Sequence, residues 1–275
     1  WRKDYYEPYK RQRQEARAAL SQKEQEEDAL FFEAFEDFKN FIIEKTNCTV
    51  LTNKQLEGDD LIAGFIQMHP NSQHVIISSD SDFQQLIASN VRQYNGISDT
   101  LITTSGFYDA KGKAIKDNKT GTLKEPVNPE WLLFEKCMRG DTSDNVFSAY
   151  PGVRTKSTKN KVGLMEAFED RNNKGYAWNN LMLQRWTDHN GVEHRVLDDY
   201  ERNVHLIDLT AQPQAIKDVV DTAILEQMSH KDVGQVGVRF MQFCGKYDLI
   251  KCSESADSFG RWMNETYKGV LNDHS

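Results

Sequence analysis

Residues 48–88 alternate short apolar runs with helical patterns. CTVLT (48–52) and HVIISS (74–79) are rich in β-branched residues, as strands are. EGDDLIAGFIQM (57–68) and SDFQQLIA (81–88) place apolar residues three and four positions apart, as amphipathic helices do. Strand, helix, strand and helix in short succession predict an α/β fold with a parallel sheet.

Residues 29–44 predict a further amphipathic helix with a heavy aromatic face. Phe31, Phe35, Phe38 and Ile42 recur at the spacing of one helical face. Large aromatic side chains at this spacing are typical of a buried face, so we expect the three phenylalanines in the core.

The pattern changes after the second predicted helix. Short strands are expected at 91–94 and 100–104, followed by a polar excursion. A helix is predicted to begin near Pro129 and to end at Gly140, a residue that commonly terminates helices. Beyond it the signal is mainly helical.

These patterns suggest two parts of the chain. We expect an α/β core over residues 1–128, whose first 28 residues are polar and partly helical. Residues 129–275 are expected to form a helical region. The sequence contains no internal repeat.

Composition narrows the class of protein. The chain has 275 residues, 38% of them hydrophobic, and contains no apolar run near the roughly 18 residues of a membrane helix. Its four cysteines lack paired C-x-x-C spacing, which argues against a zinc site or disulfide framework and favours a reducing cytoplasm. The chain opens at Trp1, which favours a fragment or a processed chain.

The net charge of −8 is unevenly distributed. Residues 1–13 carry five basic groups against two acidic groups, and residues 154–161 carry four basic groups and no acid. Local basic patches determine phosphate binding more than the total charge does. Each patch is equally consistent with phosphate binding and with ordinary solvated surface, so both interpretations stay open. The basic residues of the second patch are Arg154, Lys156, Lys159 and Lys161.

Three acidic clusters stand at the ends of predicted elements. In a parallel sheet such ends meet at one functional crevice. Carboxylates converging there would repel one another unless cations neutralise them, and oxygen ligands favour Mg²⁺ or Mn²⁺. Two such ions about 4 Å apart serve phosphodiester hydrolysis. Each cluster alone could instead be a helix cap or solvated loop. The carboxylates are Glu57, Asp59, Asp60, Asp80, Asp82, Asp141 and Asp144.

The segments LEGDDLIAGF, VIISSDSDFQQL and GDTSDNV, in this order, resemble the flap endonuclease/5′-exonuclease family. The likeness extends upstream to WRKDYYEPYKRQR, the segment that leads into the family's helical arch, and downstream to YERNVHLIDL. It implies a PIN-like parallel sheet with flanking helices, followed by a helical region of the helix–three-turn–helix type.

The resemblance also implies roles for individual residues. Asp59, Asp80, Asp82 and Asp141 would coordinate two Mg²⁺ ions, with Mn²⁺ able to substitute. Glu57, Asp60 and Asp144 would be further or water-mediated ligands. Lys10 and Arg13 would contact the scissile phosphate and act in catalysis. Nucleic acid would be bound by Arg2, Tyr9, Arg154, Lys156, Lys159 and Lys161.

Two features of the family are missing from this sequence. The family places two more metal-binding aspartates upstream of the segment that begins here, together with a central strand. Its cellular members also carry a Gly-x-Gly hairpin, often with a potassium ion, and PGVRTKSTKNKVG (151–163) keeps the basic residues without that hairpin.

The implied function is removal of RNA primers and short 5′ flaps during phage DNA replication, in the cytoplasm of the infected host. The implied partners are duplex DNA or RNA/DNA hybrid with a 5′ end or flap, with a replication clamp and a single-strand-binding protein as further candidates. We expect a monomer that binds no membrane. Two alternatives remain: a PIN-like ribonuclease, and a non-catalytic nucleic-acid-binding fragment of the same fold.

Overall fold

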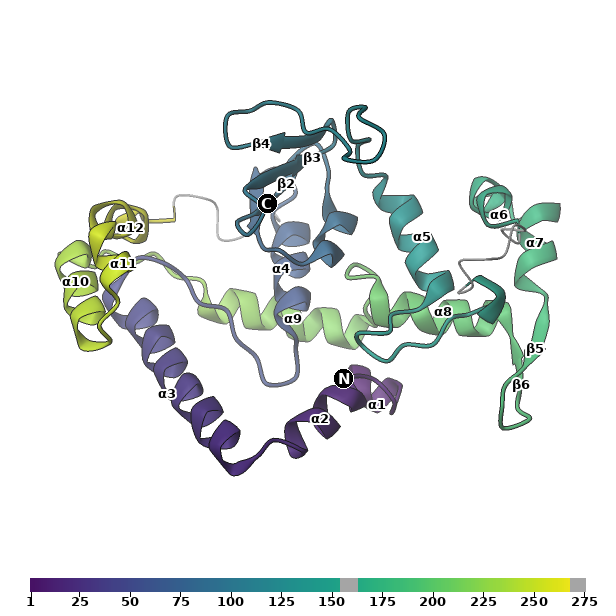
Figure 1. The fold of residues 1–275 in the computed structure, drawn as a ribbon, viewed down its shortest axis with the longest axis horizontal. Helices are drawn as coiled ribbons and strands as arrows, with labels where there is room; N and C mark the ends of the chain where they lie inside the picture. The colour runs from purple at the N-terminus through teal and green to yellow at the C-terminus, as the bar shows by residue number, and fades with distance from the viewer. Residues whose placement is uncertain (154–162, 268–275) are drawn as a thin grey trace. The chain divides into compact units, whose positions relative to one another are not determined.

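The structure, a computed structural model, describes residues 1–153 and 163–267 (Figure 1). Contacts divide the chain into two units, and each is assembled from segments distant in sequence. The first comprises Trp1–Gln14 and Ile62–Lys217, and the second Glu15–Leu61 and Asp218–Ser275. This division differs from the predicted boundary near residue 128, because packing joins segments that the linear pattern separates. A functional boundary at that residue stays a prediction.

The first unit contains a mixed four-stranded sheet in the order β1-β2-β3-β4. Only β1 and β2 are parallel, with His74 opposite Val91, whereas β2–β3 and β3–β4 are antiparallel. The sheet is therefore less parallel than predicted. The connections between the last three strands are too short for a crossover, so these strands form hairpins. The strands are β1 (His74–Ile77), β2 (Val91–Asn95), β3 (Thr100–Thr103) and β4 (Gly106–Asp109).

One face of this sheet is covered by apolar side chains. Ile76 of β1 packs with Val91 of β2 and with Phe83, which lies on the short 3₁₀ helix η1 (Ser81–Leu86). Val75 and Ile77 on β1 are exposed, so this strand is buried on one face only, and not fully as its apolar run predicts.

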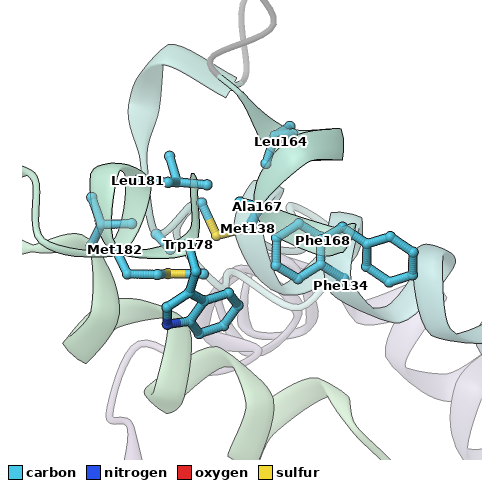
Figure 2. Packing of buried hydrophobic residues seen from close by; sticks show 10 residues of the cluster. Phe134, Met138, Leu164, Ala167, Phe168, Trp178, Leu181 and Met182 are labelled. Atoms are coloured by element: carbon cyan, nitrogen blue, oxygen red, sulfur yellow. The ribbon is translucent and has the colours of Figure 1, made fainter. Parts of the chain in front are cut away.

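The remaining elements of the first unit form a helical cluster and a hairpin. Side chains of α5, α6 and α7 pack around Met138 and Trp178 (Figure 2). The helix α5 begins after Asn128, which caps it, and ends at Gly140, as the sequence predicts. These elements are α1 (Arg2–Tyr5), α5 (Pro129–Arg139), η2 (Pro151–Val153), α6 (Leu164–Asp170), α7 (Tyr176–Met182), β5 (Arg185–Thr187), β6 (Glu193–Arg195) and α8 (Val196–Ile207).

The second unit is helical where the structure describes it. Phe41 on α3 (Gln22–Lys45) packs with Phe240 on α10 (Val236–Lys246) and with Ala256, which begins α12 (Ala256–Asn264). The short helix α11 (Ile250–Glu254) joins the last two. Three helices have residues in both units: α2 (Arg11–Ala18), α4 (Gly58–Met68) and α9 (Gln214–Gln227).

Two predictions for this unit are wrong. Residues 48–52 form no strand, although their composition favours one. Phe31 and Phe35 are 63% and 50% exposed, and of the predicted aromatic face Phe38 is also exposed. Helical spacing identifies an apolar face but does not determine what covers it. Among the described helices, none combines the length and apolar composition of a membrane-crossing helix.

Gly260 is a position where the second unit leaves no room for a side chain. A Cβ atom there would lie 2.7 Å from the Cα atom of Gly237, across the contact between α10 and α12. Gly260→Ala is expected to lower the free energy of unfolding by about 1–3 kcal/mol, because the helices must separate. Thermal or urea unfolding measures this change.

Gly245 provides the matched control. It also lies on α10, but a Cβ there meets nothing within 4 Å. Gly245→Ala is expected to leave stability unchanged or raise it slightly, since alanine favours helix. Equal effects of the two substitutions would show that the close crossing does not limit the packing.

Candidate functional site

The second acidic cluster lies where β1 leads into η1. Asp80 caps this 3₁₀ helix, and its Oδ1 accepts a hydrogen bond of 2.9 Å from the Asp82 backbone N–H. Asp80 is exposed, whereas Asp82 is partly buried. Both carboxylates therefore lie beyond the carboxyl end of β1, the position that the strand and helix pattern predicts.

The third acidic cluster occupies a tight loop after α5. Backbone bonds of 2.9 and 2.7 Å pair Asp141 with Val146 and close this loop. Inside it, Asp141 Oδ1 accepts hydrogen bonds from the Ser143 N–H at 2.8 Å and the Ser143 hydroxyl at 2.6 Å. The loop therefore holds the Asp141 carboxylate in one orientation.

Lys136 on α5 joins these two clusters. Its ammonium group is paired with Asp82 and lies 2.9 Å from Asp141 Oδ2. Sequence reasoning missed this residue. The available signal was a lysine on the predicted helix, five positions before Asp141, but helical spacing alone does not show what it faces.

The ionisation of this trio reflects burial and pairing. Burial raises the pKa of Asp82, and the charges of Asp80 and Asp141 add to this effect, although Lys136 opposes it. Burial also acts on Asp141, but hydrogen bonds from Ser143 and Lys136 outweigh it and lower the pKa of Asp141 to about 2. The two carboxylates hold the pKa of Lys136 above its ordinary value despite burial of its ammonium group. The site thus keeps a cation between two carboxylates.

Asp144 occupies the same loop but faces basic residues. Its carboxylate accepts hydrogen bonds from the Tyr9 hydroxyl at 3.0 Å and Arg13 at 2.7 Å, and Lys10 Nζ lies 3.6 Å away. The Lys10 backbone N–H also donates to the Asp144 carbonyl at 2.8 Å. The structure therefore brings the two predicted phosphate-contacting residues, Lys10 and Arg13, to the loop that carries Asp141.

Two predicted nucleic-acid contacts lie in the interior instead. Arg2 is 3% exposed, and its Nε donates to the Leu206 carbonyl at 3.0 Å. Tyr9 is buried among Cys137, Val146 and other apolar residues, so its ring is not available to stack on a base. Both residues therefore have a structural position here, and only the Tyr9 hydroxyl reaches the cluster around Asp144.

The first acidic cluster belongs to the second unit. Asp60 is buried, and its Oδ2 accepts a hydrogen bond of 3.0 Å from the Glu57 backbone N–H at the start of α4. Convergence of Glu57, Asp59 and Asp60 with the other carboxylates stays a prediction. The predicted basic residues Arg154, Lys156, Lys159 and Lys161 lie outside the described residues.

The donor set suits a hard divalent cation. Within residues 1–153 and 163–267, no three His, Cys, Asp or Glu side chains are already arranged around a metal position. However, Asp82 and Asp141 share one cation, the Lys136 ammonium group, and carboxylate oxygens are the ligands that Mg²⁺ and Mn²⁺ prefer. The chemistry of these oxygen donors therefore suits a divalent ion, and a metal site built from them stays a prediction.

A cavity of about 260 Å³ adjoins this trio. Asp82 and Lys136 line it together with Ser81, Gln85, Leu133 and Arg139. The cavity lies between η1 and α5, so the shared cation of Asp82 and Asp141 is reached from an open recess.

Comparisons with known proteins bear on the fold that carries these residues. A T5 protein crystallised with metal ions has the same fold, with a TM-score of 0.52 and 18% identity over 91% of this chain and 80% of that one. A T5 5′-exonuclease with bound zinc gives a TM-score of 0.50 and 17% identity, over 92% and 79% of the two chains. These likenesses confirm the predicted α/β fold of the PIN-like 5′ nucleases.

A sequence relative is the DNA polymerase I of Rhizobium leguminosarum. It is 27% identical over 126 residues, which are 45% of this chain and 11% of the polymerase. The match thus spans about a tenth of that protein. A family model for the 5′-3′ exonuclease N-terminal, resolvase-like domain matches residues 1–114, which include Lys10, Asp80 and Asp82. This part of the chain is therefore similar to the 5′-3′ exonuclease N-terminal domain family.

Proposed function

We propose that the chain is a structure-selective 5′-3′ exonuclease and flap endonuclease that hydrolyses phosphodiesters with two metal ions. The observation that supports this most is the cation shared by Asp82 and Asp141 beside the Lys10–Asp144–Arg13 cluster. Paired carboxylates next to a basic pair combine ligands for cations with ligands for a phosphate, as phosphodiester hydrolysis requires.

In this proposal, different residues bind the metal ions and the phosphate. Asp80, Asp82 and Asp141 would hold the metal ions, with Asp59 as a further predicted ligand. Mg²⁺ held by these carboxylates would supply an activated water and stabilise the leaving oxygen. Lys136 contacts one oxygen of Asp82 and one of Asp141, and it would give up these contacts only where an ion took the same oxygens. Lys10 and Arg13 orient the scissile phosphate and stabilise its developing charge.

Asp144 holds Lys10 and Arg13 before substrate arrives. A phosphate competes with this carboxylate for the same two basic groups, and Arg13 is exposed enough to turn towards it. Charge-assisted bonds from arginine to phosphate are as strong as those to carboxylate, so the exchange needs no new charge. Asp144 thus acts as the resting partner of the basic pair.

The proposed biological setting is phage DNA replication in the host cytoplasm. The substrates are duplex DNA or RNA/DNA hybrid with a 5′ end or flap, from which primers and short flaps are removed. A monomer that works beside a replication clamp and a single-strand-binding protein fits this role.

A second candidate is the non-catalytic nucleic-acid-binding fragment. It is favoured by one observation: the Lys136 ammonium group already pairs with both Asp82 and Asp141, the carboxylates that would hold a metal ion. Such a protein would bind flaps through its basic groups and hydrolyse nothing.

Cleavage of matched oligonucleotides separates these functions. We expect a 5′-flapped duplex to be cut in Mg²⁺, a 3′-flapped duplex to remain intact, and EDTA to abolish cleavage. The readout is product length on a denaturing gel, with flap affinity measured in Ca²⁺. Flap binding without cleavage would favour the non-catalytic fragment, and preferential cleavage of unstructured RNA would favour a PIN-like ribonuclease.

A further inference from the structure

Gln93 is a buried polar residue on the core side of the sheet. It lies in the middle of β2 and is 1% exposed, at a position whose neighbours on the same face, Val91 and Ile102, are apolar. Its side-chain Nε2 donates two hydrogen bonds, to the Ser78 carbonyl at 2.9 Å and to the Asp80 carbonyl at 2.6 Å. Both amide hydrogens are thus used on the segment that leads from β1 to the second acidic cluster.

The carbonyl oxygen of the same side-chain amide destabilises the folded state. Gln93 Oε1 is buried and accepts no hydrogen bond from the part of the chain that the structure describes. A buried acceptor without a partner costs about 1–3 kcal/mol, and an apolar side chain of the same shape would avoid that cost. The amide orientation is unambiguous, since an oxygen in place of Nε2 would face two carbonyl oxygens. Packing alone therefore does not explain an amide at this position.

The two hydrogen bonds from Gln93 act just beyond the last backbone hydrogen bond between the β1 and β2 segments. The Ser78 N–H still donates to the Tyr94 carbonyl at 3.0 Å, and beyond it the chain turns towards η1. Gln93 holds the carbonyls on both sides of that turn. Because Asp80 in turn accepts the Asp82 N–H, the orientation of the Asp80 backbone determines where both carboxylates point.

We propose that Gln93 is a positioning residue for the metal ligands Asp80 and Asp82. This inference rests on the proposed two-metal function. Gln93 touches neither metal nor substrate and acts through the backbone of the Ser78–Asp80 turn. Without its two N–H groups the turn adopts several conformations, and the carboxylates bind a cation only after an ordering cost.

Gln93→Met is the direct test, because methionine has a similar length and no donor. In the full 275-residue chain we expect Ca²⁺ or Mn²⁺ affinity, measured by titration calorimetry, to fall by about 10- to 100-fold, as for other partners that orient ligands. The Mg²⁺ concentration for half-maximal cleavage should rise by the same factor. Saturating Mg²⁺ should restore most of the cleavage rate, a rescue that a general loss of folding would not show.

Asn47 in the second unit offers a matched control. It is 5% exposed, and its Nδ2 donates to two carbonyls, of Asn264 at 2.7 Å and of Val233 at 3.3 Å. Asn47→Leu removes two donated hydrogen bonds of the same kind, together with the one that Oδ1 accepts from the Val233 N–H at 2.7 Å, at a position far from Asp80 in sequence. We expect it to lower the Tm and to leave metal affinity unchanged.

The outcomes separate this inference from the proposed function. Unchanged metal affinity in Gln93→Met, or an equal loss in Asn47→Leu, would overturn the positioning role. Should Gln93→Met not fold, Gln93→Asn keeps a polar side chain but is too short to reach both carbonyls, and the same loss of affinity is expected. An Asp80→Asn chain that binds metal and cleaves normally would instead refute the metal site itself, whatever Gln93 does.

Discussion

Asp80→Asn is expected to lower cleavage in Mg²⁺ by about 10³-fold, which corresponds to about 4 kcal/mol of lost charge stabilisation. Asparagine keeps the shape of the side chain and one oxygen, so it can still accept the Asp82 N–H that caps η1. It removes the charge that holds a divalent ion. Asp80 is exposed, so its carboxylate contributes little to packing. The measurement is the single-turnover rate on a 5′-flapped duplex.

Flap affinity in Ca²⁺ shows whether this variant still recognises its substrate. Binding is expected to survive, because the proposed phosphate contacts come from Lys10 and Arg13. Asp117→Asn serves as the control: Asp117 is another aspartate that caps a turn, accepting the Lys119 and Thr120 N–H groups. It should cleave normally. A near-normal rate for Asp80→Asn would exclude Asp80 as a metal ligand.

Gly140→Ala is expected to destabilise the first unit by about 2–5 kcal/mol, because alanine is strained at the positive φ of this residue and its Cβ overpacks the neighbouring loop. Gly140 has a φ of +69°, and a Cβ atom there would lie 2.3 Å from the Val146 carbonyl oxygen and 2.5 Å from the Phe147 carbonyl carbon. These are backbone atoms of the loop that closes around Asp141, so they can move only if the loop opens. Asp141 would then lose its orientation.

Urea unfolding and the cleavage rate together test this effect. Gly112→Ala is the control, since Gly112 has a similar φ of +74° but open space around its Cβ position. It should show the backbone strain alone, about 1–2 kcal/mol, with normal cleavage. If the two alanine variants are equally stable and equally active, the close approach at Gly140 does not restrict the Asp141 loop.

Local signals in the sequence predicted several elements correctly. Helix α4, strands β2 and β3, and helix α5 with its end at Gly140 all appear where periodicity and terminal residues place them. The acidic pair Asp80 and Asp82 was also placed correctly, at the end of a strand. These features depend on spacing and on backbone preferences within a few residues, which the linear sequence contains.

Other predictions failed because they depend on what lies across the fold. The β-branched composition of residues 48–52 was not sufficient to form a strand, since a strand needs a neighbouring strand to pair with its backbone N–H and C=O groups. The pattern of α3 predicted an apolar face, but Phe31 remains exposed. Arg2 has the charge of a phosphate ligand, yet it is buried against the Leu206 carbonyl, a residue 204 positions away.

The sequence by itself therefore determined which side chains could carry the chemistry: the acidic clusters and the basic pair Lys10 and Arg13. It also carries the likeness of residues 1–114 to the 5′-3′ exonuclease N-terminal domain. Only the tertiary structure decided which of them meet. Asp144 pairs with Lys10 and Arg13, and Lys136 lies between Asp82 and Asp141. In the sequence Gln93 is an ordinary polar residue of a strand, and only the structure shows that its amide donates hydrogen bonds to two carbonyls. The physical reason is that charge pairing and buried hydrogen bonds depend on distances in space, and residues far apart in the chain set those distances.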